Sequence, residues 1–299
     1  MKAFKGIGLL IITNLLVMFT LIISGTILIN FILPMFGIDL RDSFASMNFA
    51  WSLVFGFGGA FISLFMSKWL AKRGMKMQQV TNPSTAKEKL VFETVQALAQ
   101  REGIKMPEVW VYWDDVPNAF ATGPTRNNAM VAVSSGLAMN LSDDELKAVL
   151  AHEMGHVSNG DMLSTTLLQG LMNTFVYFVA RMIANPIMQR NYWMGFAVYM
   201  VLQTILSILA MIPISWFSRT REFKADAYAA NAVGAAPMIG ALRKIEALSN
   251  QSAAYQEHNG EEDALATMKI YAAHNQLTGL FATHPSIERR IAALQNKAP

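Results

Sequence analysis

Two histidines and a glutamate lie close together in the run His152-Glu153-Met154-Gly155-His156. Residues four positions apart project from the same face of a helix, so the two imidazoles can bind one divalent metal ion. The helix also carries the Glu153 carboxylate next to the first ligand, where it can take a proton from an attacking water and return it to the leaving amine. The run therefore predicts a catalytic zinc site in which Glu153 is the general base.

The residues around this run predict the helix that the chemistry requires. Ser142 and Glu145 have the spacing of a capping box. Apolar residues recur at helical spacing up to the motif, namely Leu141, Leu146, Val149 and Leu150. The pair Asn159-Gly160 is typical of a helix end. The alternative is an ordinary amphipathic helix whose histidines pack or face solvent, and the capped setting of the motif disfavours it.

The composition indicates an integral membrane protein. Of the 299 residues, 53% are hydrophobic and only 15% are charged, and the mean hydropathy is +0.30. Apolar residues gather in runs long enough to cross a hydrocarbon core of about 30 Å, namely 6–37, 48–67, 162–180 and 192–218. The first run is too long for the apolar core of a cleaved signal peptide, so we expect it to remain as an anchor.

Basic residues predict the orientation of these runs. Lys2 and Lys5 precede the first run, and the connection after it has Arg41 as its only basic residue. A basic cluster follows the second run, namely Lys68, Lys72, Arg73 and Lys76. Further basic residues, between positions 219 and 224, follow the last run. By the positive-inside rule, the N-terminus and the polar parts after Lys68 lie in the cytoplasm.

The residue counts exclude other kinds of site. The sequence has no cysteine, so disulfides and thiolate metal sites are excluded, and imidazole and carboxylate groups remain as strong metal ligands. The net charge of +3 is small and its basic residues are dispersed, which gives no sign of a nucleic-acid-binding surface.

The changes in polarity divide the chain into four parts. Residues 1–67 are predicted to form a transmembrane hairpin, and residues 162–218 a second hairpin that is either transmembrane or deeply embedded. Residues 68–161 and 219–299 are predicted to form the cytoplasmic catalytic part. The expected fold class is therefore an α+β integral membrane protein, mostly helical, with about four transmembrane helices and a zincin-like domain that contains a small sheet.

The sheet is predicted from three short runs before the metal helix. Residues 108–113, 119–122 and 129–133 are rich in strand-forming residues and are separated by turn residues. An unpaired edge of this sheet beside the metal could hold an extended peptide by strand addition. The residues proposed for that edge are Asn118, Ala119 and Phe120.

Helices are predicted on both sides of these elements. A helix should begin near Ser84 or Thr85 and end near Gly103. After the last apolar run, residues 221–233 and 237–248 have helical patterns, and the polar residues 249–263 favour a mobile loop.

A catalytic zinc site usually has a third protein ligand. The other histidines, His258, His274 and His284, are one source, and the C-terminal carboxylates are another. Glu222 and Asp226 are four residues apart and share a helix face, so Glu222 can complete the site while Asp226 orients a ligand imidazole. A solvated acidic stripe is the alternative for this stretch alone, but the upstream motif favours the metal site.

The chain resembles the HtpX family of membrane zinc metalloproteases, relatives of the CAAX prenyl proteases. The segments that carry the resemblance are 117–123, 150–156, 218–226 and 283–285, together with the apolar runs. The resemblance implies one Zn²⁺ per subunit, bound by His152, His156 and Glu222, with Glu153 as the base and Asp226 behind the ligands. It also implies that His284 and Arg290 stabilise the tetrahedral intermediate, although Arg289 is an equally reachable cation.

The resemblance further implies a multi-pass protease of the bacterial inner membrane with its active site facing the cytoplasm. Its substrates would be misfolded or damaged membrane proteins, degraded under stress. Two alternatives remain: a prenyl-protein-type processing protease, which the small number of apolar runs disfavours, and a non-catalytic membrane adaptor with a structural zinc, which has no use for Glu153. The sequence leaves the oligomeric state open.

Overall fold

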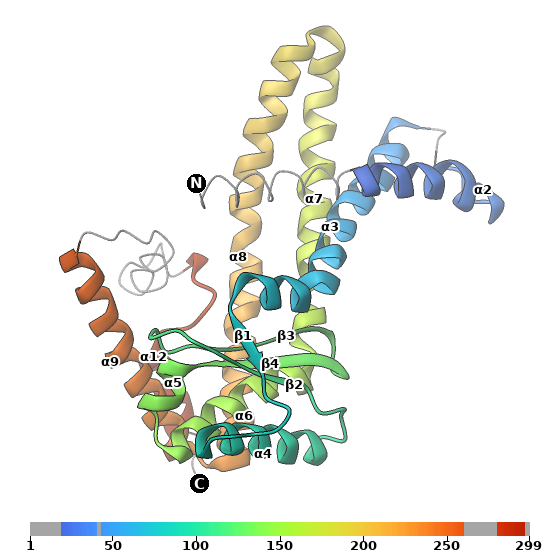
Figure 1. Ribbon diagram of the computed structural model, residues 1–299. Coiled ribbons are helices and arrows are strands. Elements are labelled where there is room, and N and C mark those ends of the chain that lie inside the picture. The colour runs from blue at the N-terminus through green and yellow to red at the C-terminus, as the bar shows by residue number, and fades with distance from the viewer. Residues whose placement is uncertain (1–18, 41–42, 260–279, 297–299) are drawn as a thin grey trace. The chain divides into compact units, whose positions relative to one another are not determined.

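The structure is a computed structural model that describes residues 19–40, 43–259 and 280–296 (Figure 1). The described residues fall into two compact units. Unit 1 lies within residues 1–64 and 166–211, and unit 2 lies within 65–165 and 212–299. The secondary-structure elements described in unit 1 are all helices, whereas unit 2 contains the sheet and the residues of the candidate site.

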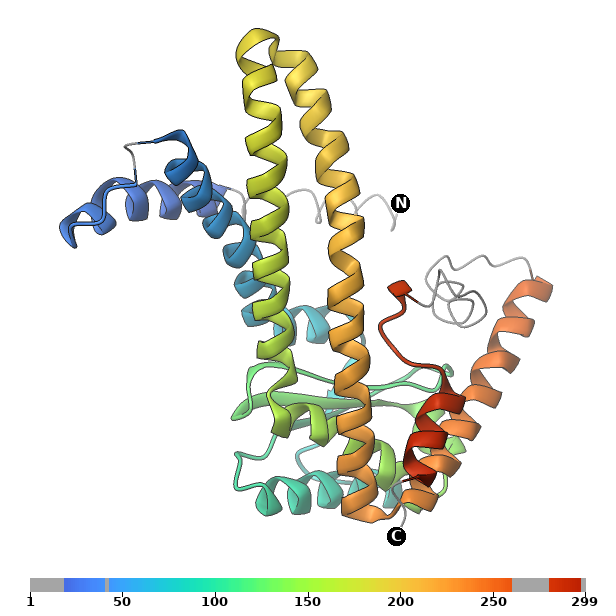
Figure 2. The ribbon, with the colours of Figure 1, turned by 180° about the vertical axis from the view of Figure 1, so that it is seen from behind.

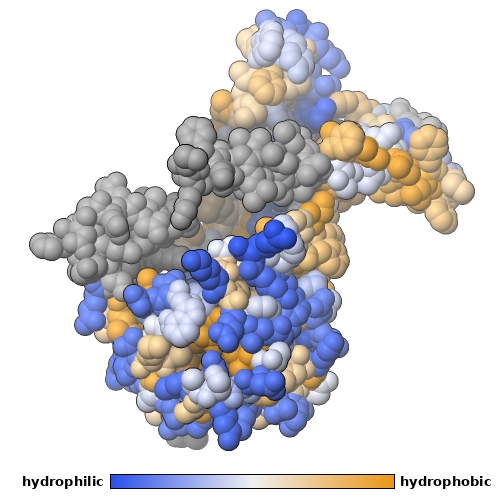
Figure 3. Space-filling view, in the orientation of Figure 1, coloured by the Kyte–Doolittle hydropathy of each residue, from blue (hydrophilic) through white to orange (hydrophobic). Residues whose placement is uncertain are grey.

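Three of the described helices are long and apolar enough to cross a membrane, namely α3 (Phe44–Gly74), α7 (Asp161–Arg190) and α8 (Tyr192–Val233). The first predicted span lies partly outside the described residues, and its described part forms a shorter apolar helix, Phe19–Met35. That helix contains η1 (Leu28–Ile32) and α2 (Leu33–Met35), and the surface around α2 is coloured mainly hydrophobic in Figure 3. Exposed apolar side chains on such helices fit a lipid environment.

Small residues allow α3 and α7 to pack closely within unit 1. A Cβ atom on Gly56 would lie 2.6 Å from the backbone nitrogen of Thr174 and 2.8 Å from the Gly170 carbonyl oxygen, so only glycine fits there. The buried Asn48 side chain donates a hydrogen bond of 3.2 Å to the Phe178 carbonyl. Small residues and interhelical polar contacts are typical of helix packing in membranes. The upper parts of α7 and α8 run side by side as a hairpin in Figures 1 and 2.

Unit 2 contains a mixed sheet in the order β1-β2-β4-β3. Its strands are β1 (Met77–Gln79), β2 (Glu108–Tyr112), β3 (Ala119–Thr125) and β4 (Asn128–Ser134). β2 and β4 pair in parallel, and the other two pairs are antiparallel. The three predicted strands are present, and β3 is an edge strand as the strand-addition hypothesis requires. β1 was not predicted because its three residues are mostly polar and exposed.

The helices α4 (Ala86–Arg101) and α6 (Asp143–Asn159) begin with the capping residues that the sequence predicts. Thr85 and Ser142 each form a capping box, with Glu88 and Glu145 respectively. α6 ends at Gly160, whose φ of 68° lies in the left-handed region that favours glycine. Among the described residues, α5 (Ser135–Asn140), α9 (Ala235–Asn259) and α12 (Ile287–Gln295) also lie within unit 2.

One hydrophobic core joins α4, α6, α9 and the sheet of unit 2. Its fully buried members include Val95, Val131, Leu146, Leu150 and Met154. The apolar residues of α6 therefore face this core, and their burial fixes the rotation of the helix about its axis. This rotation determines where the histidines of α6 point.

One prediction about the later part of the chain was wrong as far as the described residues test it, since residues 260–263 of the predicted loop lie outside them. Residues 249–259 are the end of α9 rather than a loop, because they contain no proline or glycine and are compatible with a helix. Residues 221–233 are helical as predicted, and they form the end of α8, which begins at Tyr192. The basic residues after the apolar run make this part of the helix polar, but they do not end the helix. No helix-breaking residue follows them before Gly234.

Candidate active site

Helix α6 carries His152, Glu153 and His156 within unit 2. His152 is buried, whereas Glu153 and His156 are partly buried. Gly155 allows α8 to approach this helix, because a Cβ atom there would lie only 3.2 Å from the Ala225 Cα. A larger residue at position 155 would push α8 away from the histidines. The glycine inside the motif thus has a packing role that the spacing of the ligands did not reveal.

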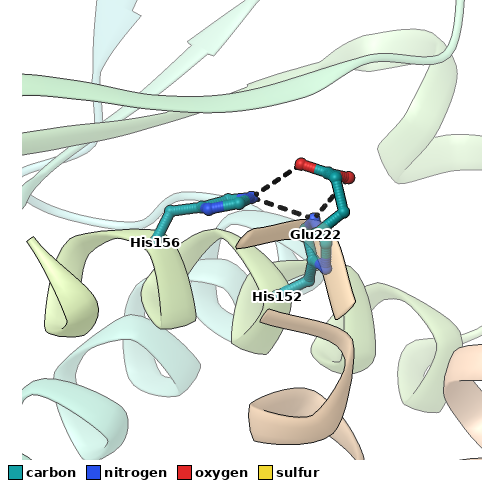
Figure 4. Close-up of side chains that lie close together, drawn as sticks. All are labelled: His152, His156 and Glu222. Carbon is teal, nitrogen blue, oxygen red and sulfur yellow. Dashed lines mark hydrogen bonds and ion pairs between the residues drawn. The ribbon is translucent and has the colours of Figure 1, made fainter. Parts of the chain in front are cut away.

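Helix α8 brings Glu222 to the two histidines (Figure 4). The Nε2 atoms of His152 and His156 are 3.2 Å apart. The Glu222 carboxylate lies 3.2 Å from Nε2 of His156 and 3.6 Å from Nε2 of His152. These three residues form a cluster whose potential ligand atoms all lie within 4.8 Å of one another.

These separations fit a tetrahedral metal ion. Bonds of about 2.0–2.1 Å to tetrahedral ligands place the ligand atoms about 3.3 Å from one another. The three side chains that converge in Figure 4 have about this spacing. They offer two imidazole nitrogens and one carboxylate oxygen, a combination typical of catalytic zinc. The residues therefore fit the metal that the sequence predicts.

Each histidine also contacts a carboxylate through its other ring nitrogen. Nδ1 of His152 lies 2.9 Å from Oδ1 of Asp226, and Nδ1 of His156 lies 2.7 Å from Oδ2 of Asp161. When each Nδ1–H donates to its carboxylate, the Nε2 lone pairs are left to bind a metal. Asp226 is where the sequence hypothesis expects an orienting carboxylate, whereas Asp161 was missed.

Arg290, on α12, reaches the site, and Arg289 does not. The buried Arg290 donates hydrogen bonds of 2.8 Å and 2.6 Å to Asp226 and lies 3.3 Å from a Glu222 oxygen. Arg289, its neighbour on the same helix, is exposed. His284 places Nδ1 3.0 Å from Glu222, and its side chain is 68% exposed. The predicted role of His284 and Arg290 in stabilising a reaction intermediate remains a prediction.

The pKa values of Glu153 and Asp226 are shifted in opposite directions by burial and hydrogen bonds. Burial raises the pKa of Glu153 above its ordinary value, despite the positive charge that the neighbouring histidines can carry. Burial alone would also raise the pKa of Asp226, but hydrogen bonds from Arg290 and His152 hold it below the ordinary value. Of these two carboxylates, Glu153 takes up a proton more readily, whereas Asp226 stays charged.

The edge strand β3 lies beside Glu153. The backbone N–H of Ala121 donates a hydrogen bond to the Glu153 carboxylate. Asn118 accepts a hydrogen bond of 2.9 Å from the backbone of Ser134, at the end of β4. Because antiparallel partners alternate, the peptide groups of Ala119 and Ala121 point away from β4, while those of Phe120 point toward it. The edge of β3 that is not paired with β4 therefore faces Glu153.

A sequence profile of Peptidase family M48 matches residues 85–298, which include every residue of this site. The chain belongs to peptidase family M48. Within M48, it is similar over nearly its whole length to proteins named Protease HtpX. The protein from Idiomarina loihiensis is 40% identical over 98% of this chain and 99% of its own length. The protein from Tolumonas auensis is 43% identical over 97% of this chain and 99% of its own length.

The fold also has a counterpart among solved structures. The crystal structure of Ste24p from S. mikatae matches with a TM-score of 0.60 and 21% identity, and the match covers 95% of this chain and 65% of Ste24p. The M48 membership and the HtpX relatives make this chain a membrane-anchored metallopeptidase. The histidine–glutamate cluster is the place in the described residues where its metal ion fits.

Proposed function

We propose that this M48 protein is a zinc-dependent endopeptidase that hydrolyses peptide bonds of misfolded or damaged membrane proteins at the cytoplasmic face of the bacterial inner membrane. The observation that carries this proposal is the convergence of His152, His156 and Glu222 beside the partly buried Glu153. Three protein ligands that leave one coordination position open are typical of catalytic rather than structural zinc. A structural site also has no use for a partly buried carboxylate next to its ligands.

The proposed metal is one Zn²⁺ per subunit. Imidazole and carboxylate ligands suit zinc, and a sequence without cysteine excludes the thiolate sites that structural zinc often uses. When bound, zinc supplies Lewis acidity to the scissile carbonyl and to the attacking water. The ligand separations of 3.2–3.6 Å support this choice.

The residues around the metal have distinct proposed tasks. Glu153 takes the proton of the attacking water and passes it to the leaving nitrogen, and its raised pKa suits both transfers. An extended substrate pairs with the edge at Asn118, Ala119 and Phe120, which aligns its backbone beside that carboxylate. His284 and Arg290 are the groups within reach of Glu222 that can stabilise negative charge on the carbonyl oxygen.

The proposed location rests on the apolar helices and the basic residues that flank them. Residues 1–67 and 162–218 anchor the protein in the bilayer, and residues 68–161 and 219–299 form the cytoplasmic catalytic part.

The quality-control role is the one that the resemblance to the HtpX family implies, and two other functions are alternatives to it. These are processing of prenylated proteins and a non-catalytic adaptor function.

The orientation predicts which introduced cysteines react with an impermeant thiol reagent. Because the natural sequence has no cysteine, each variant carries a single reactive site. Met139 is a suitable position in the catalytic part because it is 70% exposed, whereas Ser135 is only 7% exposed and would resist the reagent on either side of the membrane. We expect Met139→Cys to react only after cells are permeabilised, and the exposed Ser43→Cys to react in intact cells.

Labelling of Met139→Cys in intact cells would place the catalytic part outside the cytoplasm and refute this orientation. Protein amount and membrane insertion are compared with the cysteine-free parent as the control. The same assay repeated in permeabilised cells shows that both introduced thiols can react.

The three functions differ in what the purified protein cleaves. A zinc-loaded sample is compared on an unfolded membrane protein and on a peptide with a prenylated C-terminal cysteine. We expect cleavage of the unfolded protein at several sites and little cleavage of the prenylated peptide. The opposite preference supports the processing function, and zinc binding without any cleavage supports the adaptor.

A further inference from the structure

We propose, on the basis of the proposed zinc-peptidase function, that Asp161 is the positioning residue for His156 and that Arg221 holds Asp161 in place. Asp161 is 5% exposed, and its Oδ2 lies 2.7 Å from Nδ1 of His156. A carboxylate in this position fixes the tautomer and the ring orientation of a metal-binding imidazole. The sequence motif assigns no role to this residue.

The contact of Asp161 repeats, on the second ligand, what Asp226 does on the first. Asp226 lies 2.9 Å from Nδ1 of His152, so both rings present Nε2 to the same point. Each carboxylate is itself paired with an arginine: Asp226 with Arg290, and Asp161 with Arg221. The two ligand histidines are thus supported in the same way, although the sequence patterns indicate the carboxylate behind only one of them.

Arg221 connects Asp161 to the helix that supplies the third ligand. Besides its ion pair with Asp161, its Nη2 donates hydrogen bonds of 3.3 Å to the Asn159 carbonyl and 3.1 Å to the Ser164 hydroxyl. Its guanidinium also lies 5.3 Å from the ring of Phe217. Arg221 therefore fixes the turn between α6 and α7 against α8.

The position of Arg221 in the sequence links its contact with Asp161 to the third ligand. It directly precedes Glu222, so one turn of α8 carries both the third ligand and the residue that holds Asp161. The turn at Gly160, with φ of 68°, brings Asp161 back toward His156 on the preceding helix. The distance between Glu222 and His156 is thereby fixed by two linked contacts rather than by helix packing alone.

A purely structural role for Asp161 makes different predictions. Asp161 is the first residue of α7, where a carboxylate also stabilises a helix through its dipole. Loss of that effect lowers the stability of the metal-free protein but leaves the ligand geometry and the metal affinity unchanged. A positioning role changes metal affinity and the electronic spectrum of a bound metal. Metal binding therefore separates the two roles.

The test measures the Zn²⁺ affinity of the full-length protein in detergent by competition with a chromophoric chelator, and the absorption spectrum of the Co²⁺-substituted protein. We expect Asp161→Ala to weaken zinc binding by about 10- to 100-fold and to change the cobalt spectrum. Asp161→Asn keeps an oxygen acceptor, so we expect a smaller loss and a nearly parental spectrum. Arg221→Met should fall between the two.

Asp144→Ala is the matched control, because Asp144 is a carboxylate on α6 that pairs with the nearby Lys147 at the surface. Asp226→Ala gives the effect of the carboxylate behind His152 for comparison. Parental affinity and an unchanged cobalt spectrum in Asp161→Ala contradict the positioning role even if thermal unfolding of the metal-free protein is altered. If the parental protein binds no zinc, the proposed function itself fails. If the parental protein binds zinc and Asp161→Ala binds it equally well, only this inference fails, so the two failures are distinguishable.

Discussion

Replacing Glu153 by glutamine should lower the rate of peptide cleavage by at least about 10²- to 10⁴-fold while the protein keeps its metal. Glutamine has the same shape as glutamate, leaves both histidines free to coordinate, and still offers an oxygen to the Ala121 N–H. What the variant lacks is a group that accepts the proton of the attacking water. It also lacks the group that returns a proton to the leaving nitrogen, so one substitution affects both transfers.

The measurement for Glu153→Gln combines metal content with the initial rate on an unfolded protein substrate. Asp144→Asn is a suitable control, since it makes the same chemical change on an exposed part of the same helix. Stoichiometric zinc together with a near-parental rate would make Glu153 a bystander, and another base would have to be found. Loss of zinc from the variant would contradict the assignment of Glu153 to proton transfer alone.

Replacing Glu222 by alanine should remove zinc from the protein during purification and abolish cleavage. The substitution leaves two ligands and also removes the negative charge that pairs with His284 and Arg290, so the site becomes more positive. Asp226→Ala keeps all three ligands and loses only the group that orients His152. We therefore expect Asp226→Ala to bind zinc about 10- to 100-fold more weakly and to retain reduced activity.

Zinc content after gel filtration and the dissociation constant of re-added zinc distinguish these two variants. Glu222→Gln is the matched companion, because an amide keeps the size of the side chain but is a poor zinc ligand. Equal and full zinc occupancy in Glu222→Ala and Asp226→Ala would show that Glu222 is not a ligand. Circular dichroism establishes whether each variant keeps its helical content.

The metal helix and the sheet were predictable because their signals are local. The Ser142 capping box, the apolar spacing to Leu150 and the Gly160 helix end lie within α6 or directly beside it, and all three are present. The three longer strands alternate with turn residues and were also predicted. β1 has three residues and acquires its structure from pairing with β2, so no local pattern predicts this strand.

The rest of the site depends on tertiary contacts that spacing does not encode. Asp161 lies beyond the end of α6, and only the turn at Gly160 returns it to His156. Arg221 was interpreted from its charge alone, as a topology signal. Arg289 and Arg290 could have been distinguished, because Arg290 is four residues before the buried Leu294 and shares its helix face.

The central claim is that a single zinc ion, held by His152, His156 and Glu222, makes this membrane protein a peptidase. The most direct measurement is the degradation of an unfolded membrane protein by purified full-length protein that a chelator has stripped of metal, followed by titration with zinc. We predict no cleavage after stripping, full recovery when one zinc per chain has been added, and no recovery in Glu222→Ala. Cleavage that persists in the stripped protein, or that returns equally in Glu222→Ala, would contradict the claim.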